Sequence, residues 1–140
     1  MSSSQRSTVT PEDDAFVAAF VEGRITNQNF HHRDHLRLAW VQINRLGLER
    51  AYEVVTIDIR HFAAAHGSAH RYHDTMTRFW VRIVGMGISR HPDLGFDDLL
   101  AAEPHLLDKG LPLRHWSREA MASDSARRSW VEPDVRPIPA

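Results

Sequence analysis

The chain contains no cysteine. Disulfide bonds and thiolate metal sites are therefore excluded. No run of eighteen apolar residues occurs, so no transmembrane helix is expected. The first ten residues carry one arginine and no apolar stretch, which is unlike a secretory signal. We expect a loose tail over residues 1–10, a single domain over residues 11–140, and a cytoplasmic protein.

A strong excess of charge is also missing. The 17 Lys and Arg residues nearly balance the 18 Asp and Glu residues, which gives a formal net charge of −1. This balance offers no electrostatic reason to expect nucleic acid or an anionic membrane as a partner. A helix-turn-helix regulator is disfavoured, because no basic recognition helix is present. The expected partner is a small-molecule substrate, and the sequence leaves a homodimer open.

Long alternation of polar and apolar residues is absent, whereas helical periodicity and helix-ending signals recur. The β-branched run over residues 54–57 lies inside a longer helical pattern. We predict an all-α fold, with an up-down four-helix core, a C-terminal helical extension and an extended, proline-rich tail. The expected helices cover residues 11–22, 31–46, 48–66, 72–90, 96–103 and 117–130, and the extended tail covers residues 132–140.

Histidine is what the sequence has in abundance, with ten residues dispersed from position 31 to position 115. Helical phase, at about 100° per residue, places His32 and His35 on the apolar stripe of helix 31–46. The same argument places His73 on the apolar face of helix 72–90. Other histidines are expected on the solvated surface: His61, His91 and His105.

Short connections make neighbouring helices antiparallel, which brings these inward-facing histidines to one end of the bundle. Imidazole is the commonest metal ligand in proteins, and two from one helix turn plus a third from a facing helix suit a divalent ion. We predict a metal site of His32, His35 and His73, completed by the carboxylate of Glu22. Zinc or iron fits best, and manganese or nickel is compatible with the same ligands.

The chemistry expected of this site is that of a small metal-dependent enzyme acting on a small organic substrate. The ion would serve as a Lewis acid or hydroxide source, or iron would support oxygen chemistry. Tyr72 is a candidate acid or hydrogen-bond donor, and His66 and His70 are candidate general bases. Candidate substrate contacts come from a lid-like C-terminal segment and from helix 72–90: Arg114, Arg118, Trp116 and Trp80.

Other interpretations of the same residues remain open. The histidines could form a metal-free acid–base pocket of the isomerase or cyclase type, or could be structural side chains held by hydrogen bonds. A metal- or ligand-binding module without turnover, such as a sensor or carrier, is a further alternative. The arginines of the C-terminal segment could equally form a solvated basic face.

Several motifs resemble those of a family of small, uncharacterised bacterial proteins, whose pattern includes F-E-x-G (here FVEG), H-x-x-H-L and Y-H-[ED]-T-x-T. The resemblance implies that Glu22, His32, His35, His73 and Thr75 are the positions of interest. His115 and Trp116 replace a more typical Tyr-Tyr pair, which could alter a pocket wall. The matching segments are residues 20–23, 30–36, 39–40, 72–77, 106–110, 115–117, 126–127 and 131–134.

Overall fold

The computed structural model describes residues 8–139, so residues 1–7 of the expected tail lie outside the described part. Every regular element in that part is helical, which confirms the predicted all-α fold. Short 3-10 turns connect the longer helices: Asn27–Asn29, Ala69–Arg71, Pro104–Leu107 and Leu111–Arg114. The α-helices are α1 (Pro11–Val21), α2 (His32–Leu46), α3 (Leu48–Ala65), α4 (Asp74–Arg90), α5 (Phe96–Ala102), α6 (Arg118–Ala122) and α7 (Asp124–Arg128).

The helix ends follow the capping signals of the sequence. Thr10 caps α1, because its hydroxyl accepts from the Asp13 backbone N–H at 3.1 Å while the Asp13 carboxylate accepts from the Thr10 N–H at 3.0 Å. Gly47 separates α2 from α3 with a φ of 85°, a conformation that glycine adopts without strain. The β-branched run near Val55 stays helical, as the surrounding periodicity predicts.

The helix expected over residues 117–130 is interrupted. Ser123 is extended, with φ −71° and ψ 152°, and ends α6. Its hydroxyl then accepts from the Ala126 N–H at 3.1 Å and starts α7. The start of the segment is where the sequence places it, since the Ser117 hydroxyl caps α6 by accepting from the Ala120 N–H at 3.0 Å. The prediction of one continuous helix was wrong because a serine in the middle of the segment serves as a second cap.

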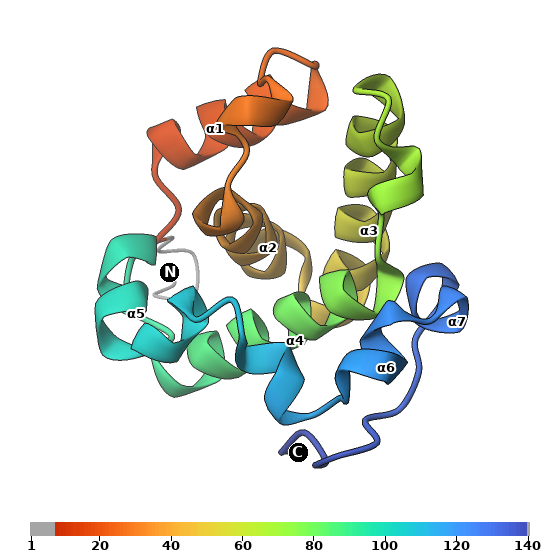
Figure 1. The fold of residues 1–140 in the computed structure, drawn as a ribbon. Helices are drawn as coiled ribbons and strands as arrows, with labels where there is room; N and C mark the ends of the chain where they lie inside the picture. Colours follow the sequence, from red (N-terminus) through yellow and green to blue (C-terminus); the bar gives the residue numbers. More distant parts are fainter. Residues whose placement is uncertain (1–7, 140) are drawn as a thin grey trace.

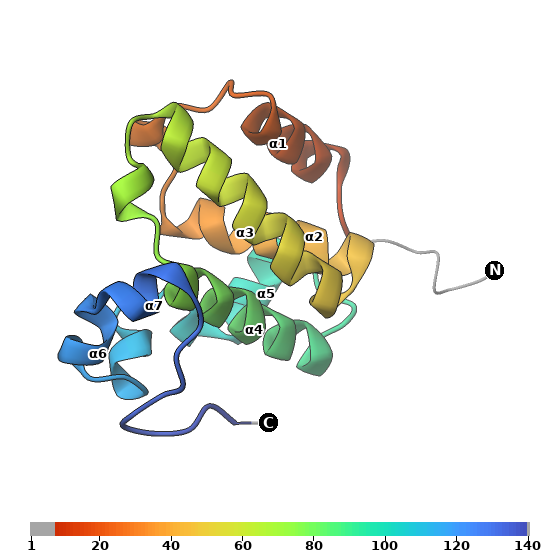
Figure 2. The same ribbon diagram turned by 90° about the vertical axis from the view of Figure 1, so that its right-hand side faces the viewer.

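The centre of the fold is formed by α2, α3 and α4, each of which packs against the other two. Figures 1 and 2 show α1 lying across the top of α2 and α3, and α6 and α7 beside α4. The start of α3 approaches α4 closely at Gly85, where a Cβ atom would lie 2.9 Å from Leu48 Cδ1. Among residues 8–139, no helix combines the length and the apolar character needed to cross a membrane.

The C-terminal segment is fastened to α4 by polar groups that are buried or partly buried. The Thr75 hydroxyl donates to the Ser129 carbonyl at 2.8 Å and accepts from the Val131 N–H at 3.2 Å. The indole of Trp116, which is fully buried, donates to the Val131 carbonyl at 3.0 Å. As predicted, residues 132–139 contain no helix. The segment is therefore a fixed extension of the core.

Candidate functional site

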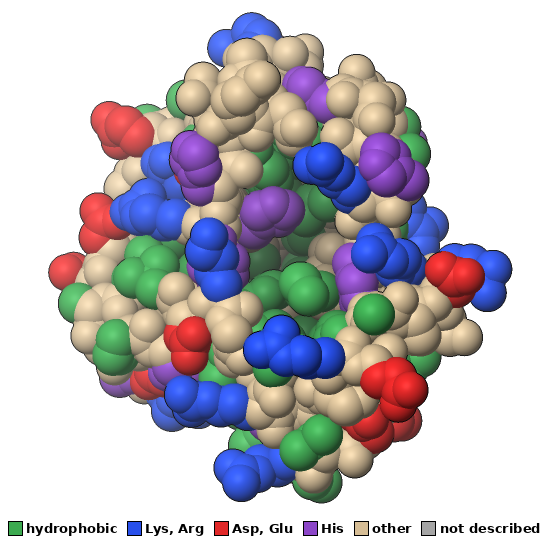
Figure 3. Space-filling model, viewed as in Figure 1, with side chains coloured by type: hydrophobic (Ala, Val, Ile, Leu, Met, Phe, Trp, Pro, Cys, Tyr) green, Lys and Arg blue, Asp and Glu red, His purple; other side chains and the backbone are tan. Residues whose placement is uncertain are grey.

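A cavity of about 500 Å³ opens between the starts of α2 and α4 and the second half of α3. Aromatic and aliphatic side chains form most of its wall, including Phe30, Phe62 and Trp80. In Figure 3 the hollow lies near the middle of the face, with histidine, lysine and arginine side chains around it. A largely apolar hollow with a few polar groups is the usual form of a small-molecule site.

His32 lies on one side of this cavity, in the first turn of α2. Its Nε2 atom is 2.8 Å from the Leu106 carbonyl oxygen, so the neutral ring carries its proton on Nε2 and leaves Nδ1 as an acceptor. The ring also packs edge-on against Trp80, with 4.5 Å between ring centroids. Burial lowers the pKa of His32 despite the backbone hydrogen bond, and the positive charge of Lys109 lowers it further.

His35 is one turn further along α2 and also lines the cavity. Burial, helped by the nearby His32, lowers the pKa of His35 from 6.5 to about 4, so the ring is neutral at pH 7. Its ring packs against Phe30 at a centroid distance of 4.3 Å. Within residues 8–139 the imidazole forms no hydrogen bond, and its ring nitrogens are open to solvent in the cavity. The neutral His35 ring can therefore donate one hydrogen bond and accept another from a molecule bound in the cavity.

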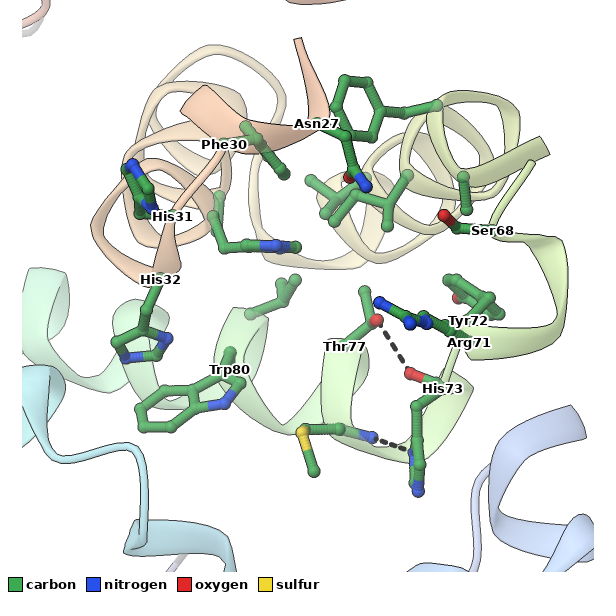
Figure 4. Close-up of a pocket in the computed structure, with 18 of the residues that line it drawn as sticks. Asn27, Phe30, His31, His32, Ser68, Arg71, Tyr72, His73, Thr77 and Trp80 are labelled. Carbon is green, nitrogen blue, oxygen red and sulfur yellow. Dashed lines mark hydrogen bonds between the residues drawn. The ribbon is translucent and has the colours of Figure 1, made fainter. Parts of the chain in front are cut away.

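His73 has a structural role that the helical-phase argument did not predict. It precedes α4 as the N-cap, and its Nδ1 accepts from the Met76 N–H at 3.1 Å. Its Nε2 then donates to the Met121 carbonyl at 2.7 Å. Figure 4 shows the ring turned away from His32, toward the C-terminal segment. Both ring nitrogens are already used, so His73 does not join His32 and His35 as a free ligand.

The other ligand expected for a metal is also elsewhere. Glu22 follows α1, is exposed, and forms an ion pair with Arg24 at 2.9 Å. Across the described residues, no group of three His, Asp or Glu side chains is arranged to hold a metal ion. The positions of these residues therefore do not fit the predicted site, and a metal cofactor stays a prediction. Metal analysis of protein purified without chelator, together with His32→Ala, tests it.

Tyr72 lines the cavity, but its hydroxyl points to a buried carboxylate. It donates to Asp74 Oδ1 at 2.7 Å, and Asp74 also pairs with Arg78 at 2.7 Å and Arg60 at 3.2 Å. Burial and the hydrogen bond to Asp74 raise the pKa of Tyr72. The single proton of the phenol is therefore engaged by Asp74 and is not directed at the cavity. Asp74 is 2 % exposed, so its carboxylate is buried together with these partners.

The two candidate bases do not line the main cavity. His66 ends α3, and its Nδ1 lies 2.9 Å from the Phe62 carbonyl oxygen. His70 lines a separate surface hollow with Arg60 and Arg127. Because neither residue lines the cavity, His35 is the best-placed proton acceptor.

Of the four predicted substrate-contact residues, one lines the cavity and three do not. Trp80 lines the cavity, as expected for a contact residue. Trp116 is buried in the core instead, with its ring 5.4 Å from Phe79 and 5.4 Å from Trp130. Arg114 is exposed and pairs with Asp108, and Arg118 is exposed on α6, so neither reaches the cavity.

Polar residues that the sequence argument missed complete the cavity. Asn27 and Arg71 come from 3-10 turns, Ser68 from the loop after α3, and Lys109 from the segment after α5. These connections carry no helical periodicity, so no sequence pattern assigned them to the site.

Comparisons of the chain with family models, curated proteins and solved structures gave no match, and the family resemblance stays an expectation.

Proposed function

We propose that this protein binds a small organic molecule in the cavity between α2, α3 and α4. The observation that carries the proposal is His35, a neutral imidazole that faces the cavity without a hydrogen-bond partner in residues 8–139. Fully buried polar side-chain atoms are all paired in residues 8–139, so the unpaired nitrogens of His35 are ones that the cavity leaves accessible. Such atoms are available to a ligand or to water.

The shape and lining of the cavity support the same function. A volume of about 500 Å³ lies in the range of small-molecule sites. Phe30, Phe62 and Trp80 offer flat apolar surface, while His32 and His35 offer polar atoms near one another on α2. A ligand of modest size could therefore bury an apolar body and still form hydrogen bonds, which provide orientation and specificity.

The same geometry favours metal-free acid–base catalysis as the second candidate. At neutral pH the His35 ring can accept a proton from a bound substrate, and after protonation it is a strong acid that returns the proton readily, since its pKa is about 4. Repeated transfer between two positions of one substrate is isomerase-type chemistry. A reaction that depends on unprotonated His35 would decline below about pH 4.

Binding can be tested with N-phenyl-1-naphthylamine, a neutral aromatic dye that fluoresces in apolar sites. Ala63 lines the cavity from α3, and Ala63→Phe would fill part of it. Ala64 is the next residue on the helix, is exposed, and does not line the cavity, so Ala64→Phe is the matched control. We expect saturable binding to the parent and to Ala64→Phe, and weakened binding to Ala63→Phe. Equal affinity of all three proteins, or no binding, would refute the proposal.

A further inference from the structure

The charges that line the cavity are of one sign. Arg71 and Lys109 both line it, and no Asp or Glu among residues 8–139 does. Neither cation has an ion pair or a side-chain hydrogen bond within the described part of the chain. Figure 4 shows Arg71 beside Tyr72 at the cavity, where its guanidinium is available to a bound molecule.

Neighbouring arginines are treated differently. Arg60 and Arg78 both pair with the buried carboxylate of Asp74. Arg37, on α2, pairs with Asp13 at 2.8 Å. Within the part of the chain that the structure describes, these cations near the site have acidic partners, while the two at the cavity have none. Arg71 and Lys109 are both exposed, so water and salt screen the attraction that they exert on an anion, and this attraction is strongest at low ionic strength.

The histidines of the cavity complement this charge. His32 and His35 are neutral at pH 7, so they neither repel a cation strongly nor attract an anion by charge. They contribute hydrogen-bonding atoms beside the aromatic wall. The cavity thus combines positive charge at its rim with neutral polar atoms and aromatic surface inside. These features match a molecule that has an anionic group at one end and a flat apolar body.

We propose that the ligand is an organic anion of this kind, whose carboxylate or similar group binds Arg71 while its apolar body lies against Phe30, Phe62 and Trp80. Lys109, which is close enough to His32 to lower its pKa, adds positive charge to the cavity wall. The guanidinium can bind a carboxylate through two parallel hydrogen bonds, and the ammonium adds a second charge. This inference rests on the proposed function, because it names the chemical class of the ligand for the same cavity.

Two dyes separate the inference from the function on which it rests. 8-Anilinonaphthalene-1-sulfonate has the same ring system as N-phenyl-1-naphthylamine and differs by one sulfonate. Fluorescence titration of both dyes with the full chain therefore isolates the contribution of the negative charge. The variant Arg71→Met/Lys109→Met removes the two cations of the cavity. Arg50→Met/Arg136→Met removes two exposed cations that do not line it and so controls for net charge.

We expect the parent to bind the sulfonate dye about tenfold more tightly than the neutral dye at low salt, which corresponds to one strong charge-assisted contact. This preference should vanish in Arg71→Met/Lys109→Met, with the affinity for the neutral dye retained, and should persist in the control. Equal affinities of the parent for both dyes would overturn the inference and leave the binding function intact. Failure of both dyes to bind would overturn both.

Discussion

Replacing Thr75 with valine tests how the C-terminal segment is held on α4. Thr75 is fully buried, and its hydroxyl both donates to the Ser129 carbonyl and accepts from the Val131 N–H. Valine keeps the shape of the side chain and removes both hydrogen bonds. The substitution therefore leaves two backbone groups of the segment without the partner that the structure gives them.

The size of the effect follows from those two groups. A buried backbone group that loses its partner costs about 1–3 kcal/mol. Ser129 is exposed and Val131 is partly exposed, so water can replace part of what is lost. We expect Thr75→Val to lower the free energy of unfolding by about 2 kcal/mol, near the lower end of the sum for two groups.

Thr56 provides a matched control within α3. It is also buried, and its hydroxyl donates to the Tyr52 carbonyl at 2.8 Å and the Glu53 carbonyl at 3.0 Å. Those carbonyls belong to the same helix and keep their backbone hydrogen bonds when the hydroxyl is removed. Thr56→Val should therefore change the free energy of unfolding by less than about 1 kcal/mol.

Urea unfolding at pH 7, followed by far-ultraviolet circular dichroism, measures both variants against the parent. The expected result is a clear loss for Thr75→Val and a small change for Thr56→Val. Equal losses would refute the reasoning, because they would show that removal of a buried hydroxyl matters more than the backbone groups left behind.

Three further predictions concern the histidines and their partners. His35 takes up its proton near pH 6.5 in the unfolded chain but only near pH 4 in the folded chain, so the free energy of unfolding should fall as the pH drops from 6.5 to 4. This residue accounts for up to about 3 kcal/mol of that fall. Urea unfolding of His35→Leu should therefore lack this part of the pH dependence. A hydrogen bond from Arg90, aided by His91, lowers the pKa of Glu103 from 4.5 to about 2. The stability that this carboxylate contributes is present above pH 4.5 and is lost as the pH falls toward 2. Because Arg90 is about half exposed, we expect the contribution to the free energy of unfolding to be about 1–2 kcal/mol. Glu103→Gln should lack this loss when urea unfolding is measured over the same pH range. His73→Ala should lower the free energy of unfolding by about 1–2 kcal/mol, and His73→Asn by roughly half as much. Asparagine restores the cap of α4 but does not reach Met121. Equal losses in the two variants would argue against the capping role.

Much of the fold could be predicted from the sequence, because its helices carry both periodicity and end signals. Thr10, Gly47 and Ser117 all act at the positions that the local pattern indicates. The same periodicity placed His32 and His35 at the cavity, since both lie inside α2, where a fixed rotation per residue applies.

His73 lines the cavity with His32 and His35, but its ring does not follow the predicted helical phase, because α4 starts two residues later than the expected helix 72–90. α4 begins at Asp74, so His73 is an extended cap, with φ −134° and ψ 106°, and helical rotation does not describe its direction. Arg71 and Lys109 lie in a turn and a loop, whose positions depend on the packed fold rather than on a repeat. The bond from His73 to Met121 is tertiary, whereas the bonds of His73 to Met76 and of Tyr72 to Asp74 are local. Together they decide which nitrogens and hydroxyls remain available.

The most direct test of the account is whether a ligand in the cavity contacts His35. Nitrogen-15 spectra of the histidine rings, recorded during titration with N-phenyl-1-naphthylamine at pH 7, report on this contact. We predict that the His35 ring signals shift and saturate with the dye, while those of the exposed His61 do not move. Saturable dye binding that leaves the His35 signals unchanged would contradict the account.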